Sequence, residues 1–191
     1  MTLTVLTKEE FQNYSEKVTH RSFVQSVQMG DLMEKRGAKV VYLSLKNEEE
    51  IQVAAMVYSL SMLGGLHMEL NAGPIYTQQE ALPIFYADLK EYAKQHGVLE
   101  FLVKPYETYQ TFDSDGNATS DEEKGLITTL TGLGYQFDGL TTGYPGGEPD
   151  WLYYKDLSGL TDKTLLNSFS KKGKPLVKKA ETFGIQLKKL K

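Results

Sequence analysis

Two hydrophobic spacings take turns along the chain, and each predicts a different kind of element. Runs that alternate apolar and polar residues, or that join β-branched and aromatic ones, are typical of strands. They cover 2–6, 38–45, 51–62, 66–70, 98–103, 135–137, 151–155 and 185–190. Runs with apolar residues three and four positions apart predict helices. They cover 7–17, 25–36, 77–96, 120–131, 161–169 and 175–182.

Polar and glycine residues mark the ends of several of these helices. The segments TKEE at 7–10 and TQQE at 77–80 both have the spacing of a capping box, in which Thr and Glu side chains accept from each other's backbone N–H. Gly37 and Gly97 follow predicted helix ends, as C-terminal caps do. In 25–36 the residues expected to face the core are Val27, Leu32 and Met33.

The order of the elements indicates the fold class. Two adjacent helices follow the first strand, three strands come next, and helices and strands then alternate. This is the order of the α/β fold of GNAT-type acyltransferases, a mixed sheet with flanking helices. We therefore expect an acetyltransferase-like subdomain over 1–156. Residues 157–191 are expected to begin a second, similar subdomain with a basic helical segment and a strand.

Composition excludes some classes of chemistry. With 40% hydrophobic and 24% charged residues the chain is typical of a globular protein. It has no cysteine, which rules out disulfide bonds and thiol catalysis and fits a reducing compartment. The N-terminus lacks the segments of a signal peptide, and no apolar run approaches the roughly 20 residues that span a bilayer. The sequence therefore predicts a cytoplasmic protein.

Charge is divided unevenly along the chain. Residues 161–191 carry nine lysines against two acidic residues, a surplus of seven positive charges. Since the whole chain has a net charge of −4, residues 1–160 carry −11. Such asymmetry points to an anionic partner at the basic end, although a solvated helix surface is the simpler interpretation. The lysines in question are Lys171, Lys172, Lys174, Lys178 and Lys179.

Several familiar kinds of site do not fit the residues present. Where an acetyl-CoA enzyme of this fold needs a glycine-rich loop, residues 71–77 read NAGPIYT, a poor cradle of N–H groups for a pyrophosphate. His20, His67 and His96 are scattered, so no pair has metal-ligand spacing. The acidic segment 113–124 lacks the glycine and the glutamate of a calcium loop, and a hairpin-like loop is expected instead.

Aromatic residues gather after the strand predicted at 98–103, whose apolar run is typical of a buried strand. Tyr106, Tyr109 and Phe112 follow Pro105 at the end of the sheet, where α/β folds commonly bind ligands. Packing at the rim of the sheet is the alternative. A second aromatic group follows in the Gly- and Pro-rich segment 139–150 and just after it, where Trp151 and Tyr153 read as core residues: Tyr144, Trp151, Tyr153 and Tyr154.

Several stretches together resemble one family. They are SFVQSVQMGDLMEKRG, NAGPIY, VKPYETYQTFDSDG, LGYQFDGLTTGYPGGEPDWLYYKDL and KKGKPLVKKAETFGIQLKKL. In this order they resemble the N-terminal half of the Fem-type (FemABX) aminoacyltransferases. Family members are about twice this length, so the resemblance implies a truncated chain that is inactive by itself.

The resemblance implies an activity and its partners. Fem-type enzymes transfer an amino acid, here expected to be alanine, from aminoacyl-tRNA to an amine on the stem-peptide branch of the peptidoglycan precursor. The implied acceptor is lipid II or a UDP-muramyl peptide, which would bring the protein to the inner face of the membrane. Aminoacyl-tRNA is the co-substrate, and neither acetyl-CoA nor a metal is implied. Such branches are a factor in β-lactam resistance.

The family's site residues transfer only in part. A family lysine that approaches the precursor phosphate aligns with Met33, or with Asp31 in a shifted alignment, and a family acidic residue is replaced by Lys104. No catalytic side chain is therefore assigned, and the implied chemistry is the positioning of two substrates. The residues expected to face the precursor are Lys35, Arg36, Lys104, Tyr106, Tyr109 and Tyr144. Those expected to bind phosphates of tRNA or lipid pyrophosphate are Lys171, Lys172, Lys174, Lys178 and Lys179.

A function of another class remains open at this point. The basic segment alone would suit a non-catalytic RNA- or anion-binding module. Both functions predict salt-sensitive binding of tRNA, but only the transferase predicts binding of a muramyl peptide.

Overall fold

The computed structural model describes residues 1–140 and 154–184. Contacts within the chain divide it into two compact units, 1–138 and 139–191. The subdomain boundary predicted between residues 156 and 157 stays a prediction.

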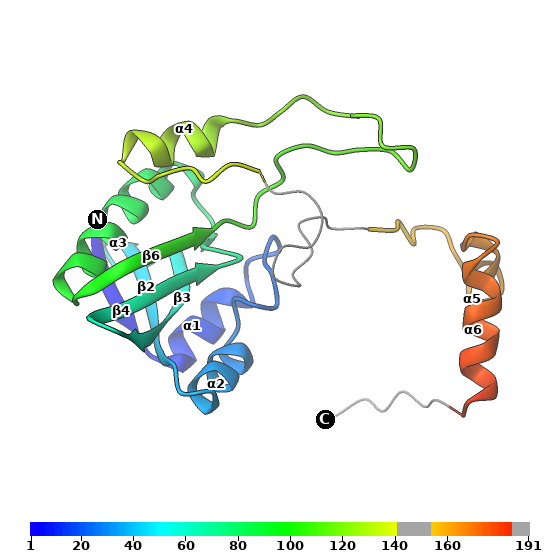
Figure 1. The fold of residues 1–191 in the computed structure, drawn as a ribbon, viewed down its shortest axis with the longest axis horizontal. Helices are drawn as coiled ribbons and strands as arrows, with labels where there is room; N and C mark the ends of the chain where they lie inside the picture. The colour runs from blue at the N-terminus through cyan, green and yellow to red at the C-terminus, as the bar shows by residue number, and fades with distance from the viewer. Residues whose placement is uncertain (141–153, 185–191) are drawn as a thin grey trace. The chain divides into compact units, whose positions relative to one another are not determined.

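The first unit is built on a six-stranded mixed sheet (Figure 1). The path through it runs β1-β2-β3-β4-β6, and the short β5 pairs with a second stretch of β3. The β4–β6 pair is parallel, and the other pairs of this sheet are antiparallel. The strands are β1 (Thr2–Leu6), β2 (Lys39–Asn47), β3 (Glu50–Met62), β4 (Gly65–Asn71), β5 (Ile75–Tyr76) and β6 (Val98–Lys104).

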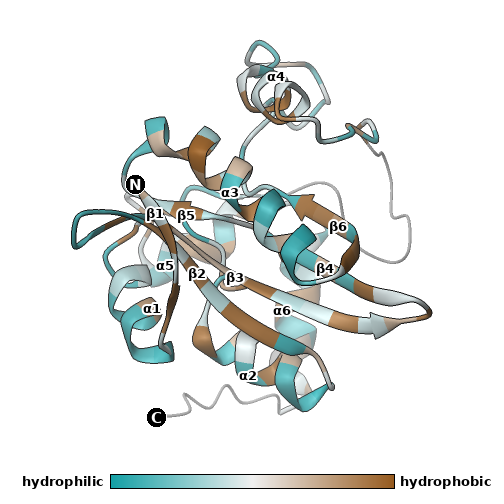
Figure 2. Cartoon of the chain, turned by 90° about the vertical axis from the view of Figure 1, so that its left-hand side faces the viewer, coloured by the Kyte–Doolittle hydropathy of each residue, from teal (hydrophilic) through white to brown (hydrophobic). Residues whose placement is uncertain are grey.

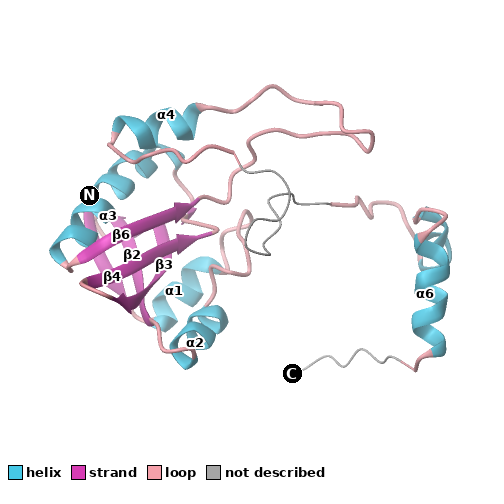
Figure 3. Cartoon of the chain, viewed as in Figure 1, coloured by secondary structure: helices cyan, strands magenta, loops and turns pink. Residues whose placement is uncertain are grey.

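Helices cover both faces of this sheet, as Figure 3 shows. Helices α1 (Lys8–Ser15) and α2 (Val27–Lys35) pack on one face, and α3 (Leu82–Gln95) packs on the other. Helix α4 (Gly125–Gly132) lies against the α3 layer through leucines. Apart from the short β5, which was not predicted, and the strand predicted at 135–137, which does not form, the order of the elements in 1–140 is the one predicted. The structure therefore confirms the acetyltransferase-like (GNAT-type) mixed α/β class.

The two cores follow from the alternation of side chains along the central strands. In β3, Val53 and Val57 join Phe85 of α3 in one buried cluster. Met56, on the opposite face, joins Phe11 of α1 in the other. Figure 2 shows the hydrophobic residues concentrated along β2 and β3, between the two helical layers. Burial on both faces therefore identifies β3 as the centre of the fold.

Only one of the two predicted capping boxes forms. Thr7 Oγ1 accepts from Glu10 N at 3.1 Å and Glu10 Oε2 accepts from Thr7 N at 2.8 Å, so α1 begins as predicted. The prediction at 77–80 is wrong. Thr77 N donates to Gln52 O at 3.0 Å, which extends the pairing of β5 with β3. A 3-10 turn, Gln79–Ala81, then precedes α3, which has no side-chain cap.

Other predictions at the edges of the fold are also corrected. Strand β6 lies at the sheet edge and is partly exposed, with Leu99 63% accessible, although its apolar run predicted a buried strand. Residues 135–137 form no strand, because Tyr135 packs instead on the α3 layer and donates to Tyr86 O at 2.8 Å. Leu32, predicted to face the core, is 39% accessible.

The regular elements described in the second unit are helical. Helix α5 (Asp162–Leu165) continues into a 3-10 turn, Leu166–Ser168, and α6 spans Gly173–Thr182. The strand predicted at 185–190 lies outside the described residues, as do 151–153 of the strand predicted at 151–155. Within 1–140 and 154–184, no helix is long and apolar enough to cross a membrane.

Candidate functional site

The carboxyl ends of β4 and β6 form the most distinctive edge of the sheet. Because the two strands are parallel, both end on the same side, and Asn71 pairs with Lys104 at that edge. Open α/β sheets bind ligands outside the carboxyl ends of their strands. Residues 105–107 leave the sheet here and pack against the segment that links α1 to α2.

Four side chains from three segments meet at this edge, and we call them the strand-end cluster: His20, Tyr76, Tyr106 and Glu107. The His20 ring stacks on Tyr106 with 5.2 Å between centroids. His20 Nε2 lies 2.9 Å from the Tyr106 carbonyl oxygen and 3.9 Å from Glu107 Oε2. The Tyr76 hydroxyl donates to Glu107 Oε1 at 3.0 Å. Burial, together with the bond to Glu107 and its charge, raises the pKa of Tyr76 to about 12.

A buried glutamine fixes the α1–α2 segment to the sheet. Gln25 Nε2 donates to Met56 O at 3.1 Å and Asn71 O at 2.8 Å, and Gln25 Oε1 accepts from Met56 N at 2.7 Å. Strand β5 pairs with β3 up to Ala54, and β4 pairs with β3 from Tyr58 onward. The Gln25 side chain bonds to Met56, in the gap between these two pairings. The side chain therefore satisfies backbone groups that a neighbouring strand would otherwise serve.

The turn after β4 is shaped to admit this side chain. Ala72 has a φ of 51° and the Gly73–Pro74 peptide is cis. A Cβ on Gly73 would lie 2.7 Å from the Gln25 amide carbon, so a glycine is needed there.

A groove of about 590 Å³ runs beside Gln25 between α1 and α2. Its one cation is Arg21, whose Nη1 donates to the buried Ser15 hydroxyl at 3.1 Å. Phe23 is 77% accessible at its rim. A guanidinium among hydroxyls and amides suits a polar or anionic ligand. The lining residues are Gln12, Ser15, Arg21, Ser22, Phe23, Gln25, Ser26, Gln28, Met29 and Leu32.

A second set of polar side chains, the strand-face network, lies across β3, β4 and β6. It consists of Tyr58, His67, Glu69 and Glu100. His67 Nε2 lies 2.8 Å from Glu69 Oε1, and His67 Nδ1 lies 2.7 Å from Glu100 Oε2. The Tyr58 hydroxyl donates to Glu69 Oε2. Since carboxylates only accept, the two short contacts favour a doubly protonated imidazole.

The electrostatics of this network agree with that protonation. The bond to Glu69 raises the pKa of His67, against the effect of burial and with a further contribution from Glu100. Burial alone would raise the pKa of Glu69, but bonds from Tyr58 and His67 and the charge of Lys104 lower it. Within 1–140 and 154–184, His, Asp and Glu form no group of three arranged to hold a metal ion.

The residues predicted after β6 lie together on one segment. Tyr106 belongs to the strand-end cluster, and Lys104 ends β6 beside it. Tyr109 stands further along, where its carbonyl accepts from Glu123 N at 2.8 Å. Burial and a bond to Glu122 raise the pKa of Tyr109. These three predicted residues are therefore neighbours along the segment, and Tyr106 is a member of the cluster.

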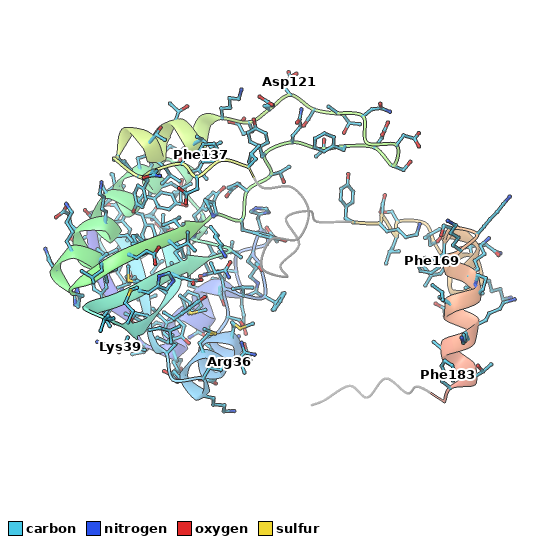
Figure 4. All side chains as sticks on the ribbon, in the orientation of Figure 1. Arg36, Lys39, Asp121, Phe137, Phe169 and Phe183 are labelled. Atoms are coloured by element: carbon cyan, nitrogen blue, oxygen red, sulfur yellow. The ribbon has the colours of Figure 1, made fainter. Side chains whose placement is uncertain are left out.

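Lys35 and Arg36 lie elsewhere, at the end of α2 (Figure 4 labels Arg36). Lys39, which follows them in β2, is in register with Phe101 of β6 across β3 and β4. Strand spacings of about 4.8 Å and a rise of about 3.3 Å per residue put the backbones of Lys39 and Lys104 on the order of 17 Å apart. Lys35 and Arg36 therefore do not join the strand-end cluster. Tyr144 lies outside the described residues.

The five predicted phosphate-binding lysines belong to the second unit. Lys171 and Lys172 occupy the turn before α6, and the other three lie within that helix. The first turn of α6 has no acidic residue, and Lys179 Nζ lies 5.6 Å from the centre of the Phe183 ring.

Sequence reasoning missed His20, Tyr76, Glu107, Gln25 and Arg21. His20 was one of three scattered histidines, and nothing local signals its contact with Tyr106, 86 residues away. For Gln25 a weak signal exists: it directly precedes Ser26, the N-cap of α2, whose Oγ accepts from Met29 N.

Comparison with known proteins gives consistent results. Residues 6–191 match the model of the FemAB family. Aminoacyltransferase FemB of Staphylococcus epidermidis (strain ATCC 12228 / FDA PCI 1200) is 28% identical over 193 residues, which cover 98% of this chain and 46% of that protein. Aminoacyltransferase FemA of the same species is 26% identical over 149 residues, 75% of this chain and 36% of that protein.

Among solved structures, the crystal structure of FemX superposes with a TM-score of 0.61 at 16% identity, covering 95% of this chain and 44% of that one. At that identity the superposition supports the fold alone. The chain spans less than half the length of these relatives.

Proposed function

Because the chain belongs to the FemAB family, we propose that the protein acts as an aminoacyl-tRNA-dependent aminoacyltransferase that builds the interpeptide branch of peptidoglycan. The observation that carries the proposal is the match of residues 6–191, together with a FemB relative aligned over 98% of the chain. The activity is proposed for the protein at the length of its relatives.

The finer proposal concerns the donor and the acceptor. The stretches quoted in the sequence analysis also resemble MurN-like members of the family, which add the second residue of the branch. We therefore propose alanyl-tRNA as the donor and lipid II, already carrying one branch residue on its stem-peptide lysine, as the acceptor. Aminoacyl-tRNA is a co-substrate, and no separate cofactor is proposed. Since lipid II is anchored in the bilayer, the protein would meet it at the inner face of the membrane.

The proposed chemistry is aminolysis of an ester. The free branch amine attacks the ester carbonyl of aminoacyl-tRNA, an amide forms, and the ribose hydroxyl leaves. The protein contributes alignment and a desolvated site with fixed charges. Lys104, Tyr106 and Tyr109 are proposed to face the precursor because they follow the carboxyl end of β6. The proposal that the precursor also contacts Lys35, Arg36 and Tyr144 rests on the family resemblance alone.

The second unit is proposed to bind phosphates. Lys171, Lys172 and Lys174 surround the N-terminus of α6, where the helix dipole already disfavours positive charge. A merely solvated helix would favour acidic residues in that turn, as in α1. A bound phosphate would relieve the mutual repulsion of these lysines, which supports an anion-binding role for them.

The test is a transfer assay with defined aminoacyl-tRNAs and purified lipid II variants, using a protein of family length that carries this chain. We expect alanine to pass from alanyl-tRNA to lipid II with one branch residue, and little transfer from seryl-tRNA or to unbranched lipid II. Product formation without aminoacyl-tRNA, or none with any donor, would refute the proposal.

Calorimetry distinguishes the transferase from the alternative function, a non-catalytic RNA-binding module. Both functions predict tRNA binding through the lysines near α6. Only the transferase predicts that a UDP-muramyl peptide binds to the same protein. If no binding is detected at millimolar concentrations of the peptide, the RNA-binding module is favoured.

A further inference from the structure

We propose that the strand-end cluster receives the protonated acceptor amine, with Glu107 attracting the ammonium group and His20 accepting its proton. The inference rests on the proposed function and adds a proton acceptor to it. The ligand is a primary ammonium group, which in the proposed reaction is the terminal amine of the branch.

The geometry of His20 defines which of its nitrogens is available. Tyr106 O can only accept, so the 2.9 Å contact requires Nε2 to carry a proton. The neutral ring then has its lone pair on Nδ1, for which no hydrogen bond is found within the described part of the chain. The side chain is 58% accessible, so Nδ1 can be reached from solvent. The stack on Tyr106 holds the ring plane in place.

Glu107 provides the complementary charge. One of its oxygens is occupied by the Tyr76 hydroxyl at 3.0 Å, and the other faces His20 Nε2 at 3.9 Å. A carboxylate in this position attracts an ammonium group. The Tyr76 hydroxyl keeps its proton at neutral pH, so it continues to orient the carboxylate.

The other charged groups near this site are accounted for. On the segment that carries His20, Arg21 is directed to the Ser15 hydroxyl. On the segment after β6, Lys104 acts on Glu69 of the strand-face network. From β5, the titratable group is Tyr76. Glu107 is therefore the carboxylate that the structure pairs with His20.

The proton balance of the step closes without a further reactant. The branch ammonium gives one proton to His20 Nδ1, and the neutral amine attacks the ester carbonyl carbon. The C–N bond forms and the C–O bond to the tRNA ribose breaks. His20 returns its proton to the departing ribose oxygen, while the second amine proton is released to water. The ring ends neutral, ready for another cycle.

The kinetic test compares His20→Gln with His96→Gln in the family-length protein. His96 caps α3 and bonds Tyr92 O, so it serves as a matched control outside the cluster. We expect His20→Gln to lower the single-turnover rate about a hundredfold, with little change in precursor affinity. The rise of rate with pH should move to higher pH in this variant alone. Wild-type rates and pH profile in His20→Gln would overturn the inference while leaving the proposed function intact.

A binding test decides the inference even if transfer is never observed. The 191-residue chain is titrated with a UDP-muramyl peptide whose branch amine is free, and with the same peptide N-acetylated. We expect the free amine to bind more tightly, and Glu107→Gln to remove about a tenfold preference. Equal affinity for the two peptides, or no binding of either at millimolar concentration, contradicts an amine site. Thermal melts of both variants verify that the fold is unchanged.

Discussion

Gln25 is wholly buried, and its amide satisfies three backbone groups of β3 and β4. In Gln25→Leu those groups would stay buried without partners, which costs about 3 kcal/mol or more of unfolding free energy. Gln28→Leu is the matched control, since Gln28 is exposed on α2 and its loss should change stability by less than about 0.5 kcal/mol. Urea unfolding of both variants provides the measurement, and equal midpoints would contradict the assigned role of Gln25.

At the residue scale, the sequence predicts what is local and misses what is remote. TKEE and TQQE have the same spacing, yet only Thr7 caps a helix. Thr77 bonds to Gln52, 25 residues away, because β5 competes with the helix for the same backbone. The partners of Gln25 are 31 and 46 residues distant, and no pattern in the sequence connects them.

Between elements, the packing of α2 on β2 depends on Gly30. A Cβ at this position would lie 2.1 Å from the Tyr42 hydroxyl oxygen, so Gly30→Ala forces α2 away from β2. We expect a loss of about 1–3 kcal/mol. Gly132→Ala in α4 has open space around its Cβ and should be neutral or stabilising by about 0.5 kcal/mol. Chemical denaturation of both variants tests the contrast.

A double mutant localises this clash. The Tyr42 hydroxyl is buried and has no hydrogen-bond partner among the described residues, so Tyr42→Phe should cost little. In that background the nearest obstacle to a Cβ on Gly30 is the ring carbon at 3.1 Å. The penalty of Gly30→Ala should therefore shrink, and strict additivity would show that the clash lies elsewhere.

The pairing of β4 with β6 should depend on pH through His67. Its pKa in the folded chain is raised above the ordinary value of 6.5 by Glu69 and Glu100. The contribution of His67 to stability is therefore fully present at pH values below its pKa in the unfolded chain. It is lost as the pH rises through its pKa in the folded chain. We expect the stability difference between wild type and His67→Asn to decrease as the pH rises from about 6.5 through the raised pKa of His67.

Glu100→Gln provides the internal control for that pH series. It removes one carboxylate partner and leaves Glu69, so the decrease with pH should be smaller than in the wild type. Urea unfolding at several pH values measures both slopes. Parallel curves for wild type and His67→Asn would show that the network does not stabilise the pair.

At the element scale, hydrophobic alternation identified the strands of the central sheet, because both faces of β2 and β3 are covered. Hydrophobic alternation gave wrong predictions for segments that contact the rest of the fold on one side only. The apolar run of β6 predicts burial, yet this strand is an edge strand of the described sheet. The run at 135–137 resembles a strand because Tyr135 and Phe137 are apolar, but Tyr135 serves as a packing residue against α3.

For the whole molecule, the division of charge predicts how it binds tRNA. Lys171→Glu/Lys172→Glu removes two cations from the turn before α6, whereas Lys17→Glu/Lys163→Glu changes the net charge equally at exposed positions elsewhere. We expect the first variant to bind tRNA more weakly and to reduce the slope of log affinity against log salt by about two. Filter binding at several salt concentrations checks this. If the slope of log affinity against log salt is the same in both variants, Lys171 and Lys172 form only a solvated surface.

The whole-molecule prediction succeeded for the fold and left the site incomplete. Element order is a property of the whole sequence and tolerates errors in single elements, so the α/β class was predicted despite a missed β5. The site depends on contacts between segments such as 20–25 and 104–107, which element order does not specify. Tyr106 could be predicted because the sequence shows where the strand before it ends. His20 could not be predicted because nothing in the sequence shows that it contacts Tyr106.

The bonding of Gln25 also has a kinetic consequence. The Met56 amide hydrogen is held by a side chain of the α1–α2 segment and not by a strand. Movement of that segment therefore releases this hydrogen, and opening of β3 at Met56 releases the segment. Deuterium exchange at Met56 should thus report the motion of the segment that carries His20 and Arg21. A slow exchange rate there would mean that both residues are held in place before any substrate arrives.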